Sequence, residues 1–267
     1  MIAYRVATWL SLVELARNKL AMALLAFFVL LWITIARVVF TTEILPVQLQ
    51  STGDVIHAGG EKLTMISGAV MSVSSLLGLM MFRIARQSSD FDQRLVADGF
   101  PLPALLAAKL TVLVAAAAVV GGYGTLCMLI YWPVKQPLLL AVGLFTGAVV
   151  YGTLGLFVGM FFAGELEGIV VLIMVSVIDM VPQNPVANPT PNSAVVPLLP
   201  NYGAIQLSTA AGFTHSAVVA PIAYSLPWFF GLTCITFGAL TRRTRTRTHT
   251  HSAKQPHPTD AIAKAPS

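Results

Sequence analysis

Charge is what this chain lacks most: Asp, Glu, Lys and Arg make up only 10% of its 267 residues, whereas apolar residues make up 56%. The mean hydropathy is +0.79, and several stretches of about twenty residues carry no charged side chain. A helix needs a stretch of that length to cross a bilayer, and at that depth it satisfies its own backbone polar groups. The composition therefore predicts an all-α integral membrane protein.

Several motifs of catalysis are also missing. No Gly-x-x-x-x-Gly-Lys-Ser/Thr sequence exists, and the nearest approach, Gly59-Gly60-Glu61-Lys62, has the wrong spacing, so the chain does not bind ATP through a phosphate loop. There is no His-Glu-x-x-His helix, no Gly-x-Ser-x-Gly turn, and no convergence of Asp and His residues within the apolar stretches. Membrane hydrolase and metalloprotease functions therefore lack a site. We expect no catalytic residue, metal or cofactor in this chain.

The apolar stretches hold few ionisable side chains, although ion-coupled carriers generally keep such groups near the membrane midplane. Arg37 and Asp179 lie near the ends of stretches, and Glu165 and Glu167 lie in a turn between two of them. We expect interfacial snorkelling for Arg37 and a solvated turn for the glutamates. Asp179 either lines a vestibule on the outer side or caps the helix that is broken near Pro182.

Six apolar windows predict six membrane-spanning helices. The first is longer than the apolar part of a signal peptide and lacks a small-residue cleavage site after it, so we expect it to remain in the protein. The fifth reaches only about 24 Å, against about 30 Å for the hydrocarbon core, and either thins the bilayer or continues into the next loop. The windows are residues 20–40, 63–82, 110–132, 138–163, 166–181 and 222–240.

Basic residues predict the orientation, because Lys and Arg are retained on the cytoplasmic side in short loops. With six spans and an inner N-terminus, only Arg37, Lys62 and Lys135 of the 16 basic residues fall on the outer side. Both termini are therefore predicted to be cytoplasmic, in a multi-pass protein of the cell membrane. The net charge of +5 reflects this topology, so nucleic-acid binding is not needed to explain it.

Two segments flank the spans. Val6, Trp9, Leu10 and Val13 recur at helical spacing, so residues 2–18 are predicted to form an amphipathic helix in the inner interface, which either anchors the N-terminus or contacts a partner. Residues 241–267 alternate Thr with Arg and then become rich in Pro, Ala and Lys, which is typical of a disordered basic cytoplasmic tail. The membrane domain is therefore predicted to be residues 1–240.

Three further stretches have a predicted structure. Residues 41–62 are expected to form a solvated outer loop, and residues 201–220 either a short helix dipping into the outer leaflet or a surface loop. The fourth window contains two small-xxx-small pairs, which favour close helix packing. The pairs are Gly143 with Gly147 and Gly155 with Gly159. The helix that packs against them belongs either to the same chain or to a second copy.

The charged segment of residues 83–109 stands out between two apolar windows. It contains signals for a short helix: Ser89 as N-terminal cap, Asp92 three residues later, and Gly99 after the last helical residue. Such an element is suited to contact a partner. The alternative is that residues 89–98 form a capped connector with no partner.

The arrangement resembles the transmembrane subunit of an ABC exporter of the second permease type. The resemblance covers residues 1 to about 240: an interfacial N-terminal helix, six spans, a cytoplasmic element between spans two and three, and a long external segment before span six. Residues 94–103, leading to Lys109, resemble the family's loop, in which a short helix and a Gly turn precede a Lys at the next span. Pro200-Asn201-Tyr202 resembles the Pro-aromatic stretch after the family's fifth span. The family often has Glu at the position of Asp98.

The resemblance implies that the helix between spans two and three docks onto a separate ATP-binding subunit. Phe91 and Leu95 would supply its apolar contact. The residues implied in this coupling contact are Ser89, Asp90, Phe91, Asp92, Arg94, Leu95, Asp98 and Gly99. The substrate pathway would include Asp179 and Tyr202. Because six spans make half a transporter, a second permease chain, identical or different, would complete the pathway.

The sequence therefore predicts the membrane-spanning subunit of an ATP-driven exporter, which moves an amphiphilic or hydrophobic compound such as a drug, antibiotic or lipid outward. The alternative function is a non-transporting membrane anchor or assembly protein for a cytoplasmic partner. In both functions the charged segment is the surface that contacts a partner.

Overall fold

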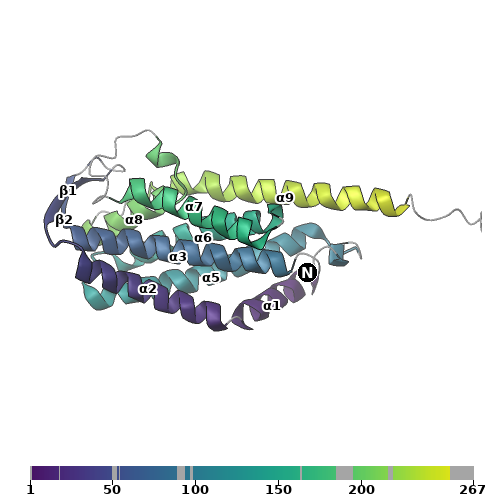
Figure 1. Ribbon diagram of the computed structural model, residues 1–267, viewed down its shortest axis with the longest axis horizontal. Coiled ribbons are helices and arrows are strands. Elements are labelled where there is room, and N and C mark those ends of the chain that lie inside the picture. Colours follow the sequence, from purple (N-terminus) through teal and green to yellow (C-terminus); the bar gives the residue numbers. More distant parts are fainter. Residues whose placement is uncertain are drawn as a thin grey trace, which may run out of the picture.

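The computed structural model describes the chain except for residues 1, 18, 50–52, 54, 89–93, 97–98, 163, 185–194, 216–218 and 253–267. Long helices dominate it (Figure 1). The elements are α1 (Ile2–Arg17), α2 (Lys19–Val39), β1 (Ile44–Gln48), β2 (Val55–Gly59), α3 (Gly60–Gln87), α5 (Leu102–Tyr131), α6 (Pro137–Phe161), α7 (Glu165–Gln183), η1 (Val196–Leu198), α8 (Tyr202–Phe213) and α9 (Ile222–Ser252).

A helix covers almost all of each of the six apolar windows. Among the described residues, α2, α3, α5, α6 and α9 contain segments long and apolar enough to cross a membrane, which indicates a membrane-embedded protein. The shorter α7 carries Glu165, Glu167 and Asp179 and does not belong to these five. Helix α9 continues to Ser252, past residue 241, where a disordered tail was expected, because neither Gly nor Pro interrupts the Thr and Arg residues there.

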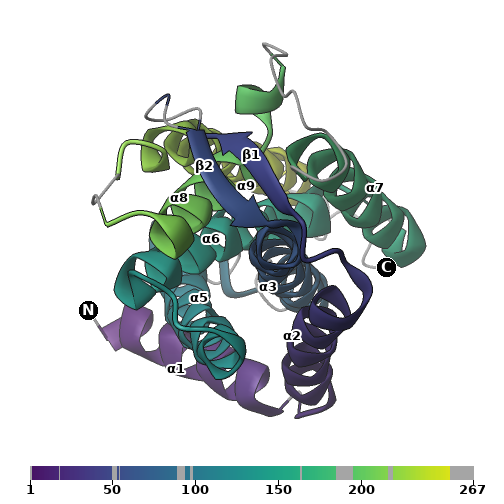
Figure 2. The ribbon, with the colours of Figure 1, turned by 90° about the vertical axis from the view of Figure 1, so that its left-hand side faces the viewer.

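Helices α3 and α6 form the centre of the bundle and share the largest helix contact (Figure 2). Tyr151 of α6 and Phe82, Leu77 and Met81 of α3 are fully buried between the surrounding helices. The bundle has two ends. We call the end that carries β1, β2 and α8 the hairpin end, and the opposite end, with α1, the end of α3 and the start of α5, the basic end (Figure 1).

The glycines of the fourth window pack within the same chain. A Cβ added at Gly155 would overlap the carbonyl oxygen of Gly78 on α3, and one at Gly159 would lie 2.8 Å from the carbonyl oxygen of Phe82. At the hairpin end, a Cβ at Gly147 would lie 2.8 Å from Asn201 Oδ1. These small residues therefore serve close contacts of α6 with α3 and α8.

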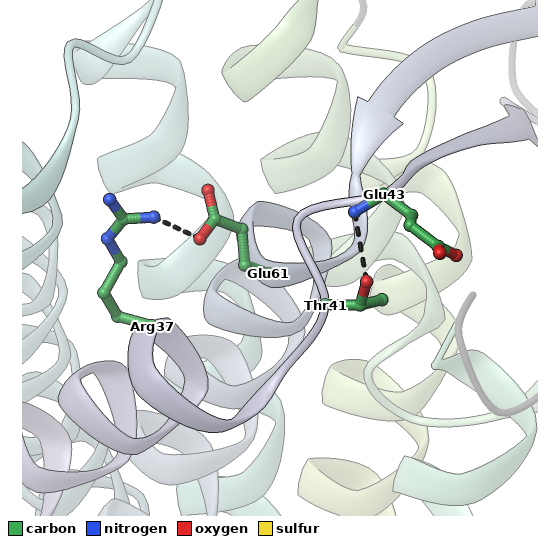
Figure 3. Close-up of polar contacts among 4 residues, drawn as sticks. All are labelled: Arg37, Thr41, Glu43 and Glu61. Carbon is green, nitrogen blue, oxygen red and sulfur yellow. Dashed lines mark hydrogen bonds and ion pairs between the residues drawn. The ribbon is translucent and has the colours of Figure 1, made fainter.

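The expected solvated loop at residues 41–62 contains an antiparallel hairpin, in which Ile44 of β1 pairs with Gly59 of β2. The β-branched residues Ile44 and Val47 of β1 and Val55 and Ile56 of β2 favour strands here. Arg37 does not merely snorkel: its guanidinium forms an ion pair with Glu61, which is buried at the start of α3 (Figure 3). Figure 3 also shows Thr41 Oγ1 accepting from the backbone N–H of Glu43, at 3.1 Å.

Candidate functional site

The charged segment contains a sharp turn at Gly99, at the basic end of the bundle. Residues 94–96 are helical, with Arg94 exposed and Leu95 half-buried. The N–H of Phe100 donates to the Leu95 carbonyl at 2.9 Å, and the N–H of Gly99 donates to the Val96 carbonyl at 3.1 Å. Gly99 has φ +90°, so this is the Schellman pattern that ends helices at glycine. The helix stop predicted at Gly99 is confirmed.

The other residues of the predicted docking surface lie outside the described residues. They are Ser89, Asp90, Phe91, Asp92 and Asp98. Their contact with a partner stays a prediction.

Side-chain bonds fix both sides of this segment to the bundle. Lys109, buried in the second turn of α5, donates from Nζ to Ser88 Oγ at 2.5 Å, and Ser88 closes the C-terminus of α3. Arg86 donates to the carbonyl oxygen of Phe162 at 2.5 Å. This places a positive charge at the C-terminus of α6, where the helix dipole favours a cation. The residues between α3 and α5 therefore start and end at helix termini that hydrogen bonds fix to the bundle.

At the hairpin end, Asp179 lies fully buried in a polar cluster that joins four helices. Its carboxylate accepts from the Tyr151 hydroxyl of α6 at 2.7 Å, from Gln183 Nε2 on α7, and from the backbone N–H of Asn201 at 3.2 Å. Ser74 of α3 donates to Asn201 Oδ1 at 3.2 Å. We call these five residues the Asp179 cluster.

Asp179 acts as a cap, but of a different helix from the one considered in the sequence. Asn201 is the N-terminal cap residue of α8, so the carboxylate lies at the N-terminus of α8, where unpaired N–H groups and the helix dipole favour an anion. In this conformation Asp179 has no exposed surface toward a vestibule. Tyr202, also buried, stacks edge-on against Tyr224 of α9, with ring centroids 5.1 Å apart.

Sequence reasoning identified Asp179 and Tyr202 but missed the rest of the cluster. Tyr151 is a polar residue in the middle of the apolar α6, and Gln183 follows the Pro182 that was expected to break the helix. Either could have been noted as a partner for a carboxylate in an apolar stretch, because buried polar groups need hydrogen bonds. Asp179 and Tyr202 thus lie at one place, whereas the charged segment lies at the opposite end of the bundle.

A cavity of about 230 Å³ lies between α2, α3 and α7. Its wall includes Phe28 and Trp32 from α2, Ser75 from α3, and Ser176 and Met180 from α7, and no charged residue lines it in the described part of the chain. Ser75 donates to Ser176 Oγ at 2.9 Å. This wall can accommodate uncharged, largely apolar groups.

No group of three or more His, Cys, Asp and Glu side chains within the described ranges could hold a metal ion. Comparison of the chain with models of known protein families, with characterised proteins and with solved structures found no match in any of the three.

Proposed function

We propose that this chain is the membrane-spanning subunit of an ATP-driven exporter, which moves an amphiphilic or hydrophobic compound outward with a separate ATPase subunit. One observation carries the proposal: residues 94–96, which are helical, and the sharp turn at Gly99 lie between α3 and α5 at the basic end. The chain has no phosphate loop of its own, so the energy must come from a partner.

The geometry of the element supports a docking role. Arg94 is exposed, and the Schellman turn at Gly99 leads within three residues into α5. Lys109 ties the first turns of α5 to Ser88 at the end of α3. Because α3 lies at the centre of the bundle, a push on this element would reach the core through short, bonded links.

The proposed arrangement in the membrane follows from the basic residues. The basic end faces the cytoplasm, and α7 serves as a sixth span, since its 19 residues reach about 28 Å. The exposed Val6, Trp9 and Leu10 of α1 would lie in the inner interface. Two such chains, identical or different, would complete the pathway, and the apolar cavity supports a ligand without charge at that site.

The first test is co-purification with a soluble protein that carries a phosphate loop and is encoded next to this chain. The double variant Phe91→Ala with Leu95→Ala should lower co-purification severalfold while the chain still inserts into the membrane. A matched control is Val55→Ala with Leu138→Ala, which truncates two exposed apolar residues at the hairpin end. Equal co-purification of both variants and the unchanged chain would refute the docking surface.

Transport is tested in inverted vesicles that contain both subunits. ATP should drive accumulation of amphiphilic dyes or lipids from a broad panel, and a non-hydrolysable ATP analogue should not. Co-purification without accumulation of any compound would contradict export and favour an anchor or assembly protein.

A further inference from the structure

The cavity between α2, α3 and α7 lies about halfway along these helices. Its wall comes from residues 28–32 of α2, 68–79 of α3 and 172–180 of α7, and each range lies at or near the midpoint of its helix. From Gly68 to Leu79 the wall follows α3 for about 16 Å. In a membrane-embedded bundle, the middle of the helices lies at the depth of the lipid hydrocarbon. The cavity is therefore long in the direction of the helix axes and lies far from both membrane surfaces.

The cavity opens to the side of the bundle, between α2 and α7. Both helices pack against α3 but make little contact with each other in the described part of the chain, and Figure 2 shows them apart. Phe28, Ile173 and Val177 line the cavity and are also 44–53% exposed on the outer surface. The exposed side chains beside them are apolar too: Phe27 and Leu31 on α2, and Met174 and Ile178 on α7. The opening is therefore continuous with an apolar surface that meets lipid.

The wall presents almost no polar surface to an occupant. Ser75 donates to Ser176 Oγ at 2.9 Å, and Ser176 donates to the Leu172 carbonyl at 2.9 Å, so these hydroxyls already have partners in the protein. Trp32 Nε1 is buried against Gly68, where a Cβ would overlap it. A polar molecule would lose its hydrogen bonds to water here, whereas a hydrocarbon chain has none to lose. A filled cavity also regains the dispersion contacts that an empty one lacks.

We propose that this cavity holds an acyl chain of a phospholipid from the bilayer, which enters between α2 and α7 while its headgroup stays at the membrane surface. The depth, the opening at the side and the apolar wall fit a hydrocarbon chain, and phospholipid is what surrounds the opening in a membrane. The proposal goes beyond the proposed function, because it concerns a lipid that stays with the protein. It requires neither an ATPase nor a second chain.

The test is photolabelling of the full chain in phosphatidylcholine nanodiscs, without ATP or a partner. A small fraction of the phosphatidylcholine carries a diazirine in the middle of one acyl chain, and adducts are mapped by mass spectrometry. Met71 and Ser72 line the cavity but are only 6% and 5% exposed, so lipid around the bundle does not reach them. We expect adducts at these two residues as well as at the exposed Phe230 of α9. Labelled Phe230 without adducts at Met71 or Ser72 would overturn the proposal.

A pair of matched variants tests the opening. Ile173→Phe with Val177→Phe enlarges two side chains at the opening and should lower the adducts at the two buried wall residues severalfold, without a change at Phe230. The control is Val170→Phe with Ile178→Phe, at residues of α7 that are about as exposed but do not line the cavity. It should leave all adducts unchanged. An equal decrease in both variants, or no decrease in the first, would contradict entry between α2 and α7.

A second probe identifies the source of the acyl chain. A free fatty acid with the same diazirine replaces the labelled phosphatidylcholine at equal mole fraction. The phospholipid should label Met71 and Ser72 at least as strongly as the fatty acid, and stronger labelling by the fatty acid would overturn the phospholipid as occupant. Chemical cross-linking through α7 into dimers, with the two wall residues unlabelled, would instead show that a second copy covers the cavity. Because the chain is tested alone, failed co-purification or failed transport would not change these results.

Discussion

The two ends of the helix bundle are held together by different kinds of contact. At the hairpin end, the side chains of Tyr151 on α6 and Gln183 on α7 and the N–H of Asn201 at the start of α8 donate to the Asp179 carboxylate, and Ser74 of α3 donates to Asn201 Oδ1. At the basic end, α6 approaches the α3 backbone at Gly159, and bonds from Lys109 and Arg86 fix the helix termini. The hairpin end therefore depends on a polar network, in which the loss of one member affects several helices, whereas the basic end depends on close helix packing.

The strongest test of this difference is Asp179→Ala. It would leave the Tyr151 hydroxyl and the Asn201 N–H buried without an acceptor, so we expect the free energy of unfolding to fall by about 3–5 kcal/mol. Denaturant unfolding in detergent measures this change. A loss below about 1 kcal/mol would show that the network does not hold the hairpin end.

A second test concerns the close packing at the basic end. Gly159→Ala would place a Cβ 2.8 Å from both the Phe82 carbonyl and Ala85 Cβ, and should lower the free energy of unfolding by about 1–3 kcal/mol because a helix backbone cannot yield easily. Gly122→Ala on α5 is the matched control, since a Cβ there meets nothing within 4 Å. It should be neutral or slightly stabilising. Similar losses in both variants would point to a general effect of the added methyl group.

The smallest effect is expected for Lys109→Met, which removes the bond to Ser88 while keeping an apolar side chain of similar length. Because Ser88 Oγ also donates to the Ile84 carbonyl at 2.7 Å, the loss should be about 1 kcal/mol. Proteolysis between α3 and α5 should become faster, without a change in cleavage at the hairpin. A decrease in the free energy of unfolding as large as that of Asp179→Ala would show that the most important polar contact lies at the basic end.

The helices and the glycine stop could be predicted from the sequence because their causes are local. A long stretch without charge predicts an apolar helix whatever the helix packs against. Gly99 has φ +90°, a backbone conformation that favours glycine over other residues. The helix at residues 202–213 was one of two alternatives, and its burial against α6 decides between them. The hairpin was missed, although Val55 and Ile56 favour a strand.

The Asp179 cluster could not be predicted from the sequence, because its bonds join distant residues. Tyr151 lies 28 residues from Asp179, and Ser74 lies 127 residues from Asn201. Only the packing of α3, α6, α7 and α8 brings them together. The same holds for Glu61, whose pairing with Arg37 depends on how α2 and α3 are joined.

The contact between Gly78 and Gly155 has a consequence for how sequences of this kind can vary. Because a Cβ at Gly155 would occupy the space of the Gly78 carbonyl oxygen, any side chain there would force α3 and α6 apart. Exposed apolar positions of α5 such as Val119 and Ile130 face no such constraint. In an alignment of related chains, we therefore expect position 155 to remain glycine while those apolar positions exchange freely, and a bulky residue at 155 should be found only together with a displaced α3.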